Sequence, residues 1–227
     1  MKKGFFNCVH SNDGFTLMEL LVALGLTATV LGIMVAFFMN FSRASTIQNA
    51  AAGAQHSARA GIDYIMQDIR MAGLDPMEKA GAGIEEISAS GKKLRFSSDR
   101  CNLPVASSGC PNPEPDGDLD DDSEIVTYLY DAAQKTLKRC LYELPATYGL
   151  ESSSGSCQAV LEKVIANPDA FPVFTFLDND DAIITNNNDR SLIRTIILTL
   201  TVEEPAGFKN KVARTYSSRV RLRNIGR

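Results

Sequence analysis

The most regular hydrophobic pattern lies near the amino terminus. Residues 20–39 contain no charged side chain. Because a helix rises about 1.5 Å per residue, this run is long enough to cross the hydrocarbon core of a membrane once. Apolar residues then recur every three or four positions, which predicts that the helix extends over 15–72 with one apolar face. Gly73 and Pro76 follow as signals that end a helix. The predicted face consists of Ile47, Ala51, Ala54, Ala58, Ile62, Ile65, Ile69 and Ala72.

After Pro76 the hydrophobic period changes from that of a helix to that of strands. Within 193–202, Ile196 and Leu198 alternate with threonines, as in a strand with one buried face. Turn-forming residues at 131–135 and 205–207 separate neighbouring strand-like runs. We therefore predict an α+β fold in which one long N-terminal helix packs on a mostly antiparallel β-sheet domain. The expected strands are 84–88, 93–97, 124–130, 136–142, 160–166, 173–177, 193–202 and 212–223.

The residues around the uncharged run indicate its orientation and narrow its role. Lys2 and Lys3 precede the run, so the amino terminus is expected in the cytoplasm and the long remainder outside the inner membrane. A secretory signal peptide has a shorter apolar region, of about 7–15 residues. A plain membrane anchor accounts for the length and orientation. It does not account for Glu19, unless that costly carboxylate lies near the membrane surface and is merely tolerated.

A longer motif accounts for Glu19 and for the residues before it. Residues 14–24, GFTLMELLVAL, closely resemble the type IV prepilin signature. In that family a prepilin peptidase cuts after the glycine, on the cytoplasmic side, and methylates the new terminal amine. The resemblance therefore implies cleavage between Gly14 and Phe15, N-methylation of Phe15, and a role for Glu19 in assembly. It also implies the type IV pilin fold.

The chemistry of Glu19 fits that role. A lone carboxylate in lipid must be neutralised or paired. In a filament of bundled helices, its partner can be the Phe15 ammonium group of a neighbouring subunit. That ammonium group exists only after the leader has been removed. The pairing would favour axial registration of the subunits over slipped packing.

The resemblance extends beyond the leader. The PilW group of minor pilins has a similar pattern, which in this chain comprises residues 94–96, the acidic stretch 116–122, residues 125–130 and 137–139, and the ending 218–224. The J-type pseudopilins of type II secretion share this outline, including a segment like 174–178. The implied division of the chain is a leader peptide at 1–14, a transmembrane and filament-core helix at 15–41, an amphipathic helix at 42–72 and a periplasmic β-sheet domain at 73–227.

The resemblance implies a minor pilin that takes part in pilus assembly or initiation as a structural subunit. It would first be a single-pass inner-membrane protein with its C-terminal domain in the periplasm, and then part of a pilus or fimbrium at the cell surface. Its partners would be the prepilin peptidase, other major and minor pilins, and the inner-membrane assembly platform. Two alternatives stay open. One is a J-type pseudopilin of a type II secretion system, and the other is a membrane-anchored periplasmic binding module that joins no filament.

The cysteines predict disulfide bonds. Cys8 lies in the leader, so the mature chain keeps Cys101, Cys110, Cys140 and Cys157. An even number in an exported domain favours disulfides over free thiols. Three pairings are possible, and we favour Cys101–Cys110 with Cys140–Cys157, because each closes a local loop rich in Ser, Gly or Pro. A four-cysteine metal site is the rival, but no Cys-x-x-Cys pair supports it.

Composition and motifs argue against other functional classes. The 227 residues are 44% hydrophobic, which is typical of a globular chain, and the net charge is −4. With only His10 and His56 as histidines, no Ser-His-Asp arrangement or other catalytic set emerges, so neither an enzyme nor a cofactor is expected. Asp116, Asp118 and Asp120 could converge on calcium. The run departs from the EF-hand template, however, and we prefer a solvated acidic loop and no metal.

The C-terminal segment is basic, with no acidic residue after Glu204. Such a segment could contact a DNA backbone. Arg219 and Arg221 alternate with Val220, however, and no aromatic residue lies between these arginines to stack on bases. We therefore expect the polar face of one strand to meet acidic loops and predict no nucleic-acid partner. Residues 178–181, DNDD, are expected to form a turn.

Overall fold

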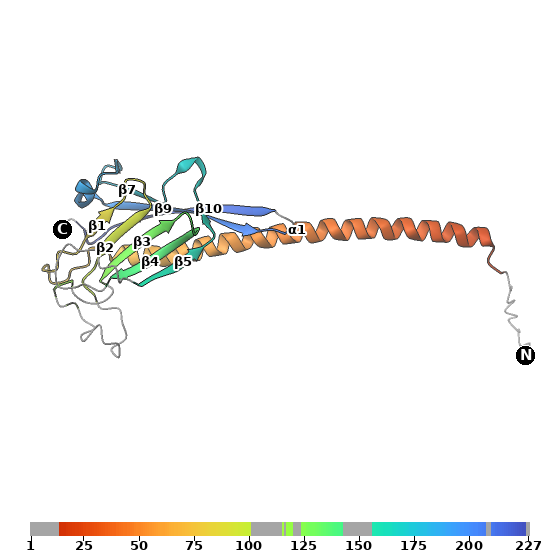
Figure 1. Cartoon of the computed structure of the whole chain (residues 1–227), viewed down its shortest axis with the longest axis horizontal. Coiled ribbons are helices and arrows are strands. Elements are labelled where there is room, and N and C mark those ends of the chain that lie inside the picture. The colour runs from red at the N-terminus through yellow and green to blue at the C-terminus, as the bar shows by residue number, and fades with distance from the viewer. Residues whose placement is uncertain are drawn as a thin grey trace, which may run out of the picture. The chain divides into compact units, whose positions relative to one another are not determined.

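The computed structural model describes residues 14–100, 115, 117–119, 124–142, 156–207 and 210–225. The chain divides into two compact units, Met1–Thr46 and Ile47–Arg227. Helix α1 (Leu17–Met71) begins in the first unit and ends in the second, where strands follow it (Figure 1). The predicted α+β class, a long apolar N-terminal helix followed by an antiparallel β-sheet domain, is confirmed.

The helix ends where the sequence predicts. Gly73 has a φ of +75°, a left-handed conformation that favours glycine. A Cβ atom at this position would also lie 2.6 Å from Ile225 Cγ1. The Gly73 N–H donates to the carbonyl oxygen of Ser97 at 2.9 Å. Glycine is therefore required here both by the backbone conformation and by the close approach of the C-terminal segment.

The first sheet has the strand order β1-β2-β3-β4-β5, and each neighbouring pair is antiparallel. Consecutive strands lie side by side, so the sheet is a simple meander. Its strands are β1 (Ile84–Ile87), β2 (Lys93–Ser97), β3 (Ile125–Asp131), β4 (Thr136–Tyr142) and β5 (Ser156–Glu162).

The later strands form a second antiparallel sheet instead of extending the first. Its order is β10-β9-β7-β8, and β6 also pairs with β9. The predicted antiparallel β-sheet domain thus contains two sheets, because β9 pairs with β10 on one edge and with β7 and β6 on the other. These strands are β6 (Val164–Ile165), β7 (Phe174–Leu177), β8 (Ile183–Ile184), β9 (Thr195–Pro205) and β10 (Lys211–Arg221).

One predicted strand was wrong and one strand was missed. The expected strand 160–166 is divided between β5 and β6, because Lys163 adopts a φ of +59° and turns the chain between the two sheets. Strand β8 was missed because two residues are too few to show alternation. Two short 3₁₀ helices, Pro168–Ala170 and Asn187–Leu192, complete the described elements.

One hydrophobic core joins the helix to both sheets. The face of α1 contributes alanines and isoleucines from Ala54 to Ala72. Phe96 and Tyr128 of the first sheet and Leu198 of the second belong to the same buried cluster. Burial of this apolar area is the main force that holds the domain together. The predicted face extends too far towards the amino terminus, since Ile47 is 40% exposed.

Candidate functional site

The predicted cleavage site lies immediately before α1. Gly14 and Phe15 precede the helix without regular structure, and the Phe15 side chain is 86% exposed. Adding a Cβ atom to Gly14 would meet no atom within 4 Å. The bond between these residues is therefore not shielded by any described part of the chain.

Glu19 closes the first turn of α1 as part of a capping box. Its Oε2 accepts hydrogen bonds from the Thr16 N–H at 3.4 Å and from the Thr16 hydroxyl at 3.3 Å. In return, the Thr16 hydroxyl oxygen accepts the Glu19 N–H at 3.3 Å. This reciprocal arrangement satisfies donors that a helix start leaves unpaired, and a negative charge there is favoured by the helix dipole. The sequence interpretation missed this role of Glu19, although Thr-x-x-Glu is its recognisable signal.

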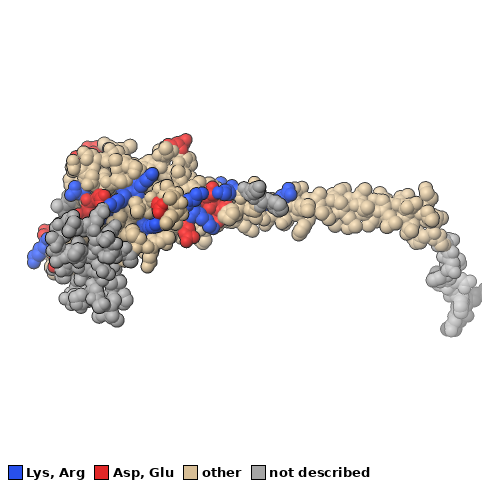
Figure 2. Space-filling model, in the orientation of Figure 1, with Lys and Arg blue, Asp and Glu red and all other residues tan. Residues whose placement is uncertain are grey.

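The part of α1 in the first unit exposes apolar side chains on all sides. Its most apolar 18-residue window has a mean hydropathy of 2.4, and none of it is buried within the chain. In the view of Figure 2 the surface of this stretch is almost entirely uncharged. The hydroxyls of Thr27 and Thr29 donate to the carbonyl oxygens of Ala23 and Leu26 at 2.6 and 2.7 Å. These polar groups are thus satisfied inside the helix, as a lipid environment requires.

A partly buried polar cluster ties α1 to the first sheet. Asp68, on the helix, accepts a hydrogen bond from Arg139 Nε at 2.7 Å and one from the Tyr128 hydroxyl at 2.8 Å. Arg100 Nη2 lies 3.5 Å from the same carboxylate. Burial raises the pKa of Tyr128, and the Asp68 charge raises it further. Burial alone would lower the pKa of Arg139, but Asp68 keeps it above its usual value.

This cluster was not predicted. Asp68 lies three residues after Ile65 and one before Ile69, at the border of the apolar face. The basic residues that contact it are distant in the sequence, so only the folded structure identifies them. The cluster fixes the rotation of α1 against the sheet, because both atoms of the carboxylate are held by groups on other elements.

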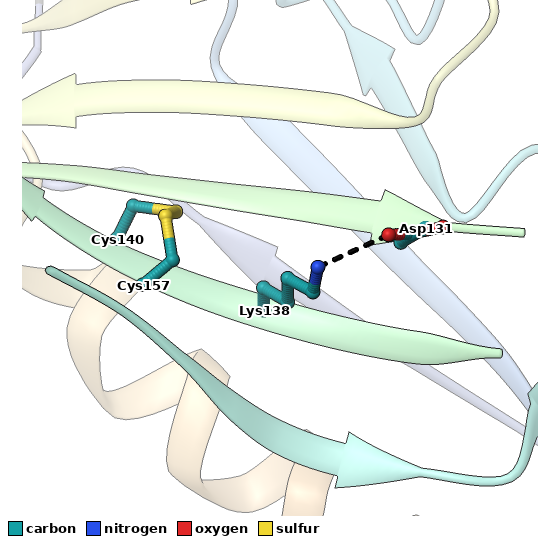
Figure 3. Close-up of a disulfide and its surroundings, with 4 residues drawn as sticks. All are labelled: Asp131, Lys138, Cys140 and Cys157. Atoms are coloured by element: carbon teal, nitrogen blue, oxygen red, sulfur yellow. Dashed lines mark hydrogen bonds and ion pairs between the residues drawn. A yellow bond between two sulfur atoms is a disulfide. The ribbon is translucent and has the colours of Figure 1, made fainter. Parts of the chain in front are cut away.

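The Cys140–Cys157 disulfide is present in the structure (Figure 3). The two cysteines are directly opposite each other on β4 and β5, with their Cα atoms 4.0 Å apart. The bond therefore holds the last strand of the first sheet to its neighbour. This is one of the two pairings that the loop composition favoured. The other, Cys101–Cys110, lies outside the described residues.

A hairpin turn follows β3 at the predicted 131–135 segment. Asp131 accepts hydrogen bonds from the N–H groups of Ala133 and Gln134, each at 3.0 Å, and pairs with Lys138 at 3.0 Å (Figure 3). The Gln134 N–H and Lys138 lower the pKa of Asp131. The carboxylate thereby stabilises the turn that joins β3 to β4.

The acidic loop gives no metal site among the described residues. Asp116 and Asp120 lie outside them, so the calcium prediction falls largely outside the described part of the chain. Within that part, no group of three or more His, Cys, Asp or Glu side chains is placed to hold a metal ion.

The C-terminal arginines meet a polar loop, as expected. Arg219 forms an ion pair with Asp181, and Arg221 donates to Asn179 Oδ1 at 3.1 Å. The loop itself is a turn, because Asp178 accepts the N–H groups of two residues that follow it, at 2.8 and 2.9 Å. The predicted turn at 178–181 and the predicted contact of this strand with an acidic loop are both confirmed.

Comparison with known proteins identifies the N-terminal motif. The family model of the prokaryotic N-terminal methylation motif matches residues 10–35. The match spans the predicted cut, Glu19 and most of the uncharged run, and it marks the chain as type IV prepilin-like. No curated protein matches the chain significantly.

Proposed function

We propose that this type IV prepilin-like chain is a minor pilin of the PilW kind, which joins a pilus or the complex that primes its assembly. Prepilin peptidase would cut it between Gly14 and Phe15 and methylate the Phe15 amine. The observation that carries the proposal is the methylation motif at 10–35, with an exposed Phe15 and with Glu19 at the first turn of α1. The expected environment is the inner membrane first and the pilus afterwards.

Each part of the chain has a separate role in this proposal. Residues 1–14 are the leader, and 15–41 cross the membrane and then pack in the filament core. Their exposed apolar side chains support this, because such a surface requires lipid or neighbouring helices to cover it. Residues 42–72 connect to the domain formed by 73–227, and the helix packs on that domain from Ala54 onwards. This domain would face the periplasm and contact neighbouring subunits.

The pairing of Glu19 links processing to assembly. In the uncut chain its carboxylate has two hydrogen-bond donors from Thr16 but no counter-ion among the described residues. Cleavage would create a positive amine at Phe15, four residues before Glu19. A neighbouring subunit displaced by one step along the filament would then supply the charge that neutralises this carboxylate in an apolar surrounding.

Two alternatives differ from this proposal in ways that can be measured. A J-type pseudopilin would undergo the same cleavage and methylation, but it would be recovered with a type II secretion apparatus and not with pili. A membrane-anchored binding module that joins no filament would not require an N-methylated phenylalanine.

The test of processing is substitution of the glycine before the cut. Gly14→Val should leave an uncut, membrane-held precursor, because the peptidase requires glycine at that position in the family that the motif resembles. The matched control is Gly83→Ala, since a Cβ atom there meets no atom within 4 Å and φ is not positive. The intact mass of each protein is measured from cells that contain the peptidase. Leader removal from Gly14→Val would contradict the proposal.

A further inference from the structure

Strand β10 is a long edge strand. It pairs with β9 over eleven consecutive residue pairs without a register shift. It stands at the end of the strand order of its sheet, and none of the described residues pairs with its other edge. An edge of this length carries a row of main-chain donors and acceptors on which another strand can pair.

The main-chain hydrogen bonds show which residues of β10 direct their N–H and C=O groups away from β9. The Ala206 N–H donates to the main-chain carbonyl oxygen of Asn210 at 2.7 Å, and the Leu222 N–H donates to that of Arg194 at 2.9 Å. Bonded pairs alternate in an antiparallel ladder, so the even-numbered residues of β10 bond to β9. The odd-numbered residues therefore direct their N–H and C=O groups away from β9. They are Lys211, Ala213, Thr215, Ser217, Arg219 and Arg221, and all six are exposed.

The other described edge strands carry features that limit pairing. Strand β8 has two residues, and β1 has four with an irregular register at Ile84/Glu86. Strand β5 has seven residues, a register shift against β4 and the disulfide to Cys140. Short strands, bulges, prolines and charged side chains are the usual protections of sheet edges. Of these, strand β10 has only charged side chains, and all of them are basic.

The charge of β10 selects the kind of partner. Its basic residues are Lys211, Arg214, Arg219 and Arg221, and it has no acidic residue. Lys211 forms an ion pair with Glu203, and Arg219 forms one with Asp181. Arg214 forms no ion pair with any described acid, and its guanidinium donates to the Ala213 oxygen at 3.4 Å. Two copies of β10 side by side would bring like charges together, which is destabilising, whereas an acidic strand would be attracted.

We infer that the free edge of β10 is a docking site for an extended acidic segment of a different subunit, which adds to the sheet beside β10. The inference rests on the proposed function, because that function supplies neighbouring subunits. Main-chain hydrogen bonds to the outward groups give the attachment, and acidic side chains meeting Arg214 and Arg221 give the selection.

A proline on the free edge tests the main-chain part. Ser217→Pro removes one outward N–H and no bond to β9, a position at which an edge strand tolerates proline. The matched control is Ser217→Ala, which also loses the hydroxyl contact with Thr199 but keeps the N–H. The full-length variants are produced in piliated cells, and copies per sheared filament are counted by mass spectrometry. We expect at least tenfold fewer copies of Ser217→Pro than of Ser217→Ala. Equal numbers would overturn the inference.

A charge reversal tests the partner's chemistry without touching the ladder. Arg214→Glu should reduce incorporation severalfold relative to Lys92→Glu, which makes the same charge change at an exposed residue between β1 and β2. Equal incorporation of these two variants would overturn the inference that the docking segment is acidic. Folding of Ser217→Pro is checked by comparing its digestion by trypsin with that of the unaltered chain. If the variant is digested faster, it has not folded correctly, and the inference is decided by Arg214→Glu alone. Failure of the proposed function would be distinct, because the unaltered chain would then be absent from filaments.

Discussion

At the scale of single residues, the proposed function gives the Glu19 carboxylate a second role beside the capping contacts that the structure shows. Within one chain it caps the first turn of α1 through Thr16, and in a filament it would neutralise the amine of a neighbour. The first role places the carboxylate at the start of the helix, close to where the new amine would appear. The second role would give the assembled state an interaction that the precursor lacks.

These two roles can be separated by substitution. Glu19→Gln keeps an acceptor for the capping box but cannot form an ion pair, so we expect leader cleavage to continue and incorporation into filaments to fall at least tenfold. Thr16→Val removes the capping hydroxyl but keeps the charge of Glu19, and it should incorporate much better than Glu19→Gln. Copies in sheared filaments are counted beside the intact mass of the membrane fraction. Incorporation of Glu19→Gln at the unaltered level would show that the ion pair is not needed.

At the scale of elements, α1 is built from two stretches with different surroundings. Residues up to Thr46 expose apolar side chains everywhere, whereas those from Ala54 bury one face against the strands. Alanine at Ala54 and Ala58 allows close approach, and Gly61 allows it further, since a Cβ atom there would lie 3.1 Å from Leu161 Cδ2. Asp68 then fixes the rotation of the helix by its contacts with Arg139 and Tyr128.

Removal of the Asp68 carboxylate should be costly. Asp68→Ala leaves Arg139 and Arg100, whose side chains are each 16% exposed, without their shared counter-ion. We expect the free energy of unfolding to fall by about 3–5 kcal/mol. Asp63→Ala, at an exposed position of the same helix, should change it by less than about 0.5 kcal/mol. Urea unfolding of the full chain in detergent, followed by tyrosine fluorescence, measures both. Similar losses in the two variants would contradict the role of Asp68.

Long periodic elements were predictable from the sequence, and short or irregular ones were not. The limits of α1 and most strands followed from apolar spacing and from the glycine at Gly73, because local chemistry determines them. The division into two sheets depends on which strands pair with β9 and on the left-handed conformation of Lys163. No local sequence pattern predicts either. The cleavage motif could be recognised from the sequence because its residues are contiguous. The contacts of Asp68 were not, because they join residues up to 71 positions apart.

At the scale of the whole molecule, the proposed processing and the proposed recognition of neighbours would use different parts of the chain. The apolar residues of the first unit would insert and pack, and the second unit would offer polar surfaces such as the β10 edge to particular neighbours. A minor pilin needs both, because all subunits share the helix bundle while only some positions in the assembly suit a given domain. Specificity would then come from the sheets and from charged residues such as Arg214.

The most direct test of the central claim is the mass of the amino-terminal peptide of the protein recovered from its own cells. The account predicts a chain that begins at Phe15 and carries one methyl group on its terminal nitrogen, followed by Thr16 and Leu17. A peptide that still contains residues 1–14, or one that begins at Phe15 without the methyl group, would contradict it.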